Sequence, residues 1–315
     1  VQRKRYFTPM LSFDGTKIAH DMNRSRSFDR VAKNISFLAK HWPFQKFKMT
    51  VNDRSLPHLA DGVFSVLARN CGLDLNLVHE NVWGNVAEKK RHLQVLEREL
   101  ARLVDFFSEN PTVQPPNLVS LPIAKCLGPN ADRSKPWCGA GDAMVAVDRT
   151  GTQYPCHRFI KFSAGKAMSL EEFKALPKGT KQNPSCESCP MKLACPTCQG
   201  CNWECNGSTT DRVTYNCEML KLQMVATAAI QLNRISAEMS GKETAKLAPE
   251  KLVEMGRQLD AARFTFSALA EVPQNELKPY VTGDWPNGKG WDQRVRWHES
   301  SKTKSNVPSP QARTQ

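Results

Sequence analysis

The chain has 315 residues, a formal net charge of +13 at pH 7 and a sequence pI of about 9.3. This length supplies enough apolar residues for one or two hydrophobic cores, so folding does not need disulfides. No apolar run is long enough to span a membrane, and the basic N-terminal residues lack the apolar segment of a signal peptide. We therefore expect a cytoplasmic protein without membrane contacts, in which clustered cysteines bind metals or do redox chemistry.

The first hundred residues predict strands that alternate with helices. Apolar segments at 6–13, 47–51 and 73–78 have strand character, and residues with helical spacing separate them. Ser27 is a candidate N-cap of the first helix, and the longest amphipathic pattern ends at about residue 108. This alternation predicts βαβ units with parallel strands. Three such units do not close a barrel, which leaves a small open sheet or half of a larger barrel.

The remaining chain changes composition several times. A Pro-rich stretch marks the first boundary, and a cysteine-rich part with short strands such as the one at 143–148 follows it. Two helical patterns then precede an end rich in polar residues, Pro and Gly. The predicted segments are an αβ region (1–110), a linker (111–125), a cysteine-rich domain (126–222), a helical extension (223–272) and a disordered basic tail (273–315).

The cysteines are the strongest functional signal. The chain has 11, and all except Cys71 lie between residues 126 and 217. Thiolates separated by two residues can bind one metal from a single tight turn, and the sequence from 186 to 198 contains two such pairs. With flanking cysteines these pairs provide enough thiolates for two four-ligand sites. Spacing alone favours zinc and iron–sulfur about equally, whereas Cys71 is expected to be a small buried hydrophobe.

Two stretches resemble a known enzyme family. "CGAGDAMVAVDRTGTQYPCHRF" (138–159), "CESCPMKLACPTCQGCNWECNG" (186–207) and "YNC" (215–217) together resemble the SPASM domain of radical SAM enzymes that mature peptides and proteins, including anaerobic sulfatase-maturase-like and thioether-peptide-maturase enzymes. "LSFDGTKIAHDMNRSRSFDRVAKNISFL" (11–38) is similar to the fourth-strand segment of their barrel. The resemblance implies an α/β fold: the C-terminal half of a partial (β/α)6 barrel, a small α+β SPASM domain and C-terminal helices.

The resemblance also implies two auxiliary 4Fe–4S clusters. Each would tie together segments that are distant in sequence. Carried over by position, cluster I takes Cys138, Cys156 and Cys198, and cluster II takes Cys186, Cys189, Cys195 and Cys217. The fourth ligand of cluster I is assigned to Cys126, with Cys201, Cys205 or an open iron as alternatives.

The family's radical step needs a CxxxCxxC loop that holds a third 4Fe–4S cluster and S-adenosyl-L-methionine (SAM). The sequence contains no such motif. The resemblance therefore implies an N-terminally incomplete chain that is inactive alone. Ser12, at a strand end, and Arg24, which can bind a carboxylate, are the candidate SAM contacts. The alternative is a plain turn and a solvated charge, with His20 and Asp21 orienting the turn.

The sequence thus predicts a fragment of a radical SAM oxidoreductase that modifies a peptide or protein. No catalytic residue is identified. In the complete enzyme, SAM and the third cluster would join the two auxiliary clusters, and a flavodoxin or ferredoxin would donate electrons. The competing hypothesis is a zinc-binding module without enzyme activity that binds nucleic acid, and the net positive charge is its main support.

Overall fold

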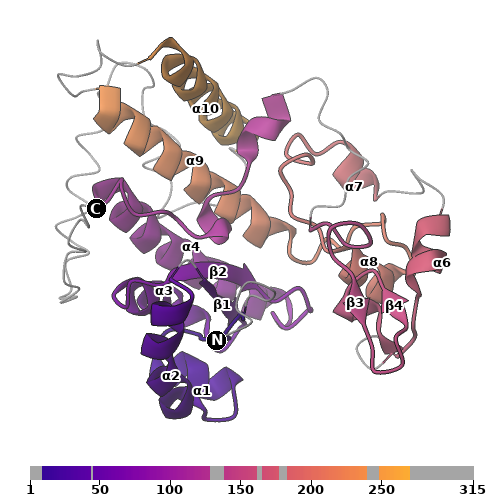
Figure 1. Ribbon diagram of the computed structural model, residues 1–315. Coiled ribbons are helices and arrows are strands. Elements are labelled where there is room, and N and C mark those ends of the chain that lie inside the picture. The colour runs from indigo at the N-terminus through magenta and orange to yellow at the C-terminus, as the bar shows by residue number, and fades with distance from the viewer. Residues whose placement is uncertain are drawn as a thin grey trace. The chain divides into compact units, whose positions relative to one another are not determined.

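The computed structural model describes residues 9–43, 45–127, 138–161, 165–176, 183–239 and 248–269. The protein is a mixed α/β, helix-rich chain (Figure 1). It divides into two compact units, here called the αβ unit (Val1–Leu121 with Lys221–Gln315) and the cysteine unit (Pro122–Leu220). The predicted tail (273–315) lies outside the described residues. No described helix is long and apolar enough to cross a membrane.

The sheet of the αβ unit is a parallel pair, as predicted. β1 (Lys46–Val51) pairs with β2 (Gly72–Leu77) in register from Lys46 opposite Gly72 to Val51 opposite Leu77. A short 3-10 turn, η1 (Leu56–His58), and α3 (Leu59–Leu67) connect the two strands. A helical crossover is the usual connection between parallel neighbours, because a tight hairpin cannot join them.

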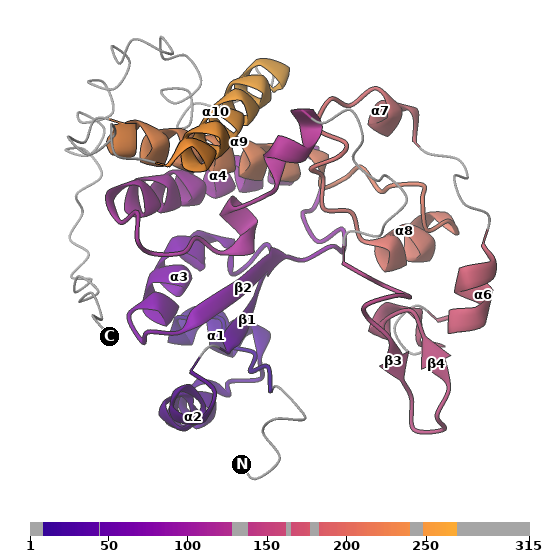
Figure 2. The ribbon, with the colours of Figure 1, turned by 45° about the horizontal axis from the view of Figure 1, so that its top comes forward.

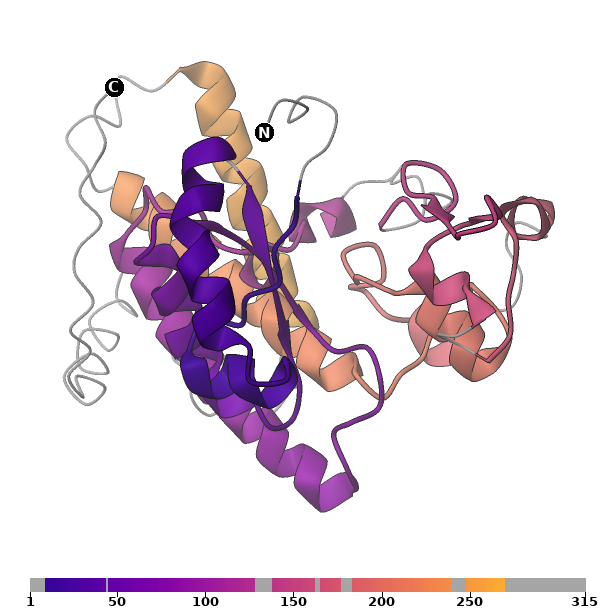
Figure 3. The same ribbon diagram turned by 60° about the horizontal axis from the view of Figure 1, so that its bottom comes forward.

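The predicted strand at 6–13 is reduced to one bridge where it is described. Ser12 pairs with Lys48, and the flanking backbone groups of Leu11 and Phe13 exchange hydrogen bonds of 2.9 Å with Lys48. In the ribbon, the indigo segment near the N-terminus runs beside the strand pair (Figure 3). Pro9 has no N–H with which to extend this pattern. Within the described residues each of the two sheets has two strands, and no barrel forms.

The helices predicted in this region are present, and a short helix that was not predicted precedes them. α1 (Lys17–Asn23) has Thr16 as its side-chain cap, and α2 (Phe28–His41) begins directly after Ser27. Ser27 makes no capping bond, since its Oγ lies 3.1 Å from Nε2 of His20. The longest helix, α4 (Val86–Glu109), begins with a capping box, in which the Asn85 side chain and Glu88 satisfy each other's backbone N–H groups.

α3 and α4 contribute large side chains to the apolar core of the αβ unit. Their fully buried side chains include Leu59, Val63, Leu96, Leu100 and Phe107. Asn117, in η2 (Asn117–Val119), accepts a hydrogen bond from the Leu75 backbone at the free edge of β2.

Two C-terminal helices complete this unit, α9 (Cys217–Met239) and α10 (Pro249–Ala268). α9 runs along α4 (Figure 2), where the Arg234 guanidinium donates hydrogen bonds to the backbone oxygens of Phe107, Asn110 and Val113. Phe107 lies in the last turn of α4, and Asn110 and Val113 follow it, so Arg234 binds α9 to the C-terminal end of α4 and to the segment after it.

The cysteine unit has only short elements. The predicted strand at 143–148 is limited to two residues, because Asp148 accepts hydrogen bonds from the backbone of Thr150 and Thr152 and so turns the chain. The elements of this unit are η3 (Ile123–Leu127), β3 (Ala146–Val147), β4 (Gln153–Tyr154), η4 (His157–Phe159), α6 (Leu170–Ala175), α7 (Pro184–Glu187) and α8 (Gln199–Asn206). β3 and β4 form an antiparallel hairpin.

A small apolar cluster supports these short elements. It consists of Ala140, Cys156, Phe159 and Trp203, and the Phe159 and Trp203 rings stack with centroids 5.2 Å apart. The cluster joins the hairpin region, η4 and α8 through side-chain packing rather than through backbone ladders.

Candidate metal-binding cysteine groups

The three thiols that were predicted to bind cluster I lie close enough in space to interact electrostatically. Burial in the apolar cluster is the main cause that raises the pKa of Cys156, and the Cys198 and Cys138 thiols raise it further. The pKa of Cys198 is likewise raised, first by burial and also by Cys138. Thiolates that raise each other's pKa repel one another, and a shared cation removes that repulsion. We call Cys138, Cys156 and Cys198 group I.

Backbone N–H groups point at two of these sulfurs. The Arg158 N–H donates to Cys156, and the Gly200 and Cys201 N–H groups donate to Cys198, with 3.4 Å between Cys201 N and Cys198 Sγ. Cys198 is the N-cap of α8, so the sulfur lies where a helix presents unpaired donors. Such hydrogen bonds stabilise the thiolate form that metal binding requires.

Arg158 fastens the Cys156 segment to α8. A Cβ added to Gly200 would lie 2.7 Å from the Arg158 Cβ, so the arginine stem passes directly over this glycine. Its Nη1 then reaches Oε2 of Glu204 at 2.5 Å. The positive charge lowers the pKa of both Cys156 and Cys198, against the larger effect of burial.

The four predicted cluster II thiols form a second group, called group II: Cys186, Cys189, Cys195 and Cys217. Burial is the main reason that the pKa of Cys195 rises to about 12. The Cys217, Cys189 and Cys186 thiols raise the pKa further, whereas Arg212 lowers it. Arg212 is held by a hydrogen bond of 3.2 Å to the Lys192 carbonyl.

Cys126 lies beside group II. Its pKa is raised by burial and by Cys189, while its sulfur accepts hydrogen bonds from the Ala194 and Leu193 backbone. Assignment of Cys126 to cluster I stays a prediction, and its position beside Cys189 offers a fifth thiol to group II. Spacing could not foresee this neighbour, because residue 126 precedes both groups in sequence.

All 11 cysteines lie within the described residues, and none of them is joined in a disulfide. The thiols of each group interact electrostatically but do not converge on one point, since no set of three or more His, Cys, Asp or Glu side chains in the described ranges has metal-binding geometry. The donors in both groups are sulfur only, which fits zinc or an iron–sulfur cluster and does not fit magnesium or calcium. Cys201 and Cys205 face Tyr215 instead.

The predicted SAM contacts belong to the αβ unit. Arg24 forms a two-pronged ion pair with Asp14, with Nε–Oδ2 at 3.0 Å and Nη2–Oδ1 at 3.1 Å. Asp14 is 1% exposed and also accepts from the Thr50 N–H. His20 Nδ1 accepts from the Asp14 N–H, and Asp21 accepts from the Phe28 N–H. His20 and Asp21 therefore orient the turn, as predicted.

Arg24 also lines a hollow of about 250 Å³ at the carboxyl ends of β1 and β2, the usual position of ligand sites in parallel sheets. Ser12 is not one of its lining residues. The sequence interpretation missed Asn52 and Arg54, which also line the hollow; their position directly after a predicted strand was the available signal.

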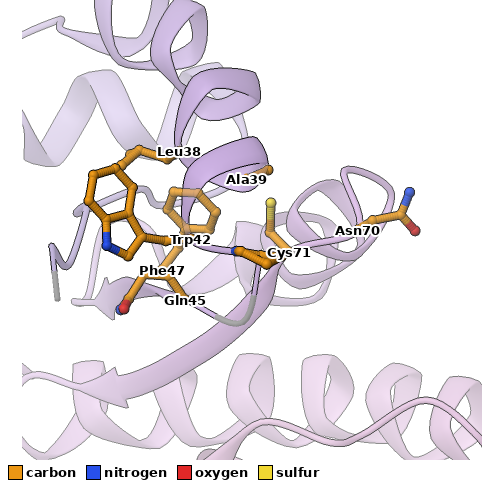
Figure 4. Close-up of a pocket in the computed structure, with 8 residues that line it drawn as sticks. Leu38, Ala39, Trp42, Gln45, Phe47, Asn70 and Cys71 are labelled. Carbon is orange, nitrogen blue, oxygen red and sulfur yellow. The ribbon is translucent and has the colours of Figure 1, made fainter. Parts of the chain in front are cut away.

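Cys71 is a buried hydrophobe, as expected. Figure 4 shows it near Leu38, Trp42 and Phe47, around a hollow of only about 10 Å³. Burial raises the pKa of this thiol, which makes it a poor nucleophile. Cys71 therefore serves as a control position for thiol experiments.

No protein-family model matches the chain, and no curated protein matches it significantly in sequence. Its function is therefore argued from its own residues.

Proposed function

We propose that this chain is the auxiliary-cluster part of a radical SAM enzyme that modifies a peptide or protein. In this proposal the αβ unit is half of a partial (β/α)6 barrel, and the cysteine unit is a SPASM domain with two 4Fe–4S clusters. The observation that carries the proposal is the division of seven thiols into group I and group II. The family pattern requires this same interleaved division.

The residues of the chain have distinct roles in this proposal. Group I and group II thiolates hold the clusters, while backbone N–H groups and the arginines Arg158 and Arg212 offset negative charge near the sulfurs. Bound clusters supply redox chemistry, as an acceptor for the electron left after hydrogen abstraction or as a peptide-binding site.

The αβ unit supports the barrel part of the proposal. A bridge at Ser12 followed by the parallel pair β1 and β2 gives a run of parallel neighbours, and the hollow lies at their carboxyl ends. Arg24 lines this hollow while it is bound to Asp14, and the part of its guanidinium that Asp14 does not occupy would contact a SAM carboxylate in the complete enzyme. A peptide or protein substrate and a flavodoxin or ferredoxin are the partners that this role requires.

Anaerobic expression of the full chain with added iron and sulfide tests the proposal. The expected product is brown, with iron and acid-labile sulfide in the amounts of two 4Fe–4S clusters. The Cys198→Ser and Cys195→Ser variants should each lose one cluster, and reduced samples should show the loss of different EPR signals. Cys71→Ser is the matched control and should keep both clusters.

A colourless protein that carries stoichiometric zinc would overturn the proposal. Binding of that zinc form to nucleic acid would then support the alternative hypothesis, a zinc-binding module without enzyme activity that binds nucleic acid. If Cys195→Ser and Cys198→Ser lose the same EPR signal, the division into two clusters is wrong even when iron is present.

A further inference from the structure

Cys201, Cys205 and Tyr215 form a thiol cluster outside group I and group II. The two cysteines are one turn apart on α8, so their side chains share one face of the helix. Cys201 Sγ lies 3.1 Å from Tyr215 Oη, and Cys205 Sγ lies 3.7 Å from the same oxygen. One hydroxyl therefore holds both sulfurs close to each other.

The two thiols differ in access to solvent. Cys201 is 1% exposed, whereas Cys205 is exposed. An exposed thiol beside a buried partner is the arrangement of an attacking cysteine and its resolving cysteine. Tyr215 can donate its hydroxyl proton to either sulfur and so stabilise negative charge there.

We propose that Cys205 and Cys201 are a redox-active pair that reduces hydroperoxides and closes to a disulfide. The Cys205 thiolate attacks the hydroperoxide, the O–O bond breaks, and Cys205 sulfenic acid and an alcohol form once the alkoxide takes up a proton. Cys201 then attacks the Cys205 sulfur, so that the S–S bond forms and water leaves. In total, two thiols lose two electrons and two protons, and the hydroperoxide gains them.

Closure requires the last turn of α8 to move. Residues one turn apart have Cβ atoms roughly 5–6 Å apart, and a disulfide needs about 4 Å. Cys205 is the penultimate residue of α8, and Gly207 caps the helix with φ +68°, so only the terminal turn has to open. A disulfide closed across a distorted turn is readily reduced, which suits a reversible pair.

Oxidation of this pair would change the contacts that support the group I cysteines. The Cys201 N–H donates to Cys198 Sγ, and Glu204, next to Cys205, holds Arg158. Movement of the terminal turn of α8 therefore disturbs the contacts that support Cys156 and Cys198, whichever metal group I binds. The redox pair itself does not rest on the proposed function.

The test uses the full chain, purified anaerobically with its metals bound and treated with limiting tert-butyl hydroperoxide. After denaturation and alkylation, trypsin cleavage at Lys192 and Arg212 releases one peptide that contains all four cysteines from 195 to 205. Tandem mass spectrometry should locate a disulfide between Cys201 and Cys205, and a thiol reductant should remove it. The Cys205→Ser variant should lose this product, and Cys71→Ser should retain it.

A second variant follows the intermediate. Cys201→Ser should leave Cys205 as a sulfenic acid that dimedone traps, and Tyr215→Phe should slow oxidation of the wild-type pair. The proposal is overturned if Cys201 stays alkylated while Cys205 is over-oxidised. It is equally overturned if the disulfide joins either cysteine to Cys195 or Cys198. Because Cys205 is exposed, the Cys205→Ser variant should fold. Loss of the disulfide in this variant would therefore report the missing thiol and not misfolding.

Discussion

In the αβ unit, α3 and α4 bury leucine and phenylalanine side chains against a parallel strand pair, whereas the cysteine unit buries one small cluster around Phe159 and Trp203. The first unit is therefore stabilised mainly by loss of apolar surface to water. The second depends on individual links, such as the Arg158–Glu204 ion pair and the contacts of Asn202. A region with short elements and a small core needs cross-links, and grouped thiols offer them through metal.

Metal removal should have the largest effect on the difference in stability between the αβ unit and the cysteine unit. If metal holds the cysteine unit together, binding contributes on the order of 10 kcal/mol to its folding, as in small metal domains. A chelator should then abolish protection against hydrogen exchange around groups I and II and leave β1, β2 and α4 protected. Hydrogen exchange with mass spectrometry measures both regions in one sample. Equal hydrogen-exchange protection of the cysteine unit before and after chelation would contradict the claim that metal stabilises this unit.

A core truncation should act on the other unit. Phe107 is fully buried on α4, and Phe107→Ala should lower the free energy of unfolding of the αβ unit by about 3–5 kcal/mol. Urea unfolding monitored by circular dichroism measures the change. The exposed Val253→Ala on α10 is the control and should change stability little. A loss of similar size in both variants would show that the effect is not cavity formation.

The Asp14 network gives a smaller expected effect. Asp14→Asn removes the charge that pairs with Arg24, while its amide oxygen can still accept from the Thr50 N–H. We expect a loss of about 2 kcal/mol, because one buried charge partner disappears and Arg24 retains partial access to water. Comparison with Asp29→Asn, at an exposed ion pair, separates the buried contribution from ordinary surface charge.

The smallest expected effect is a pH dependence in the αβ unit. Burial lowers the pKa of His20, against the attraction of Asp14, so the folded state favours the neutral ring. The unfolded chain therefore takes up more protons below about pH 6.5, and stability should fall as the pH drops from there toward the lowered pKa. His20→Gln should reduce this slope relative to the unsubstituted chain. Thermal unfolding across pH 5–8 measures both, and identical slopes would contradict the prediction.

Local sequence signals predicted the regular elements of the αβ unit well. The strands β1 and β2 and the helices α2 and α3 lie within a few residues of the predicted segments, because hydrophobic spacing is a property of neighbouring residues. The end of α4 at Glu109 also agrees with the prediction. The same signals overestimated the strand at 143–148, where the Asp148 side chain turns the chain. Where it is described, from residue 9 onward, the predicted first strand is reduced to the bridge between Ser12 and Lys48.

The sequence by itself identified the candidate functional residues, through the spacing of seven cysteines and the turn motif that contains Asp14 and Arg24. Only the tertiary structure decided which groups meet. It placed Cys126 beside Cys189, committed Arg24 to Asp14, and turned Cys201 and Cys205 toward Tyr215. Spacing describes how far apart residues are along the chain, whereas charge interactions and shared hydrogen bonds depend on distances in space that packing alone sets.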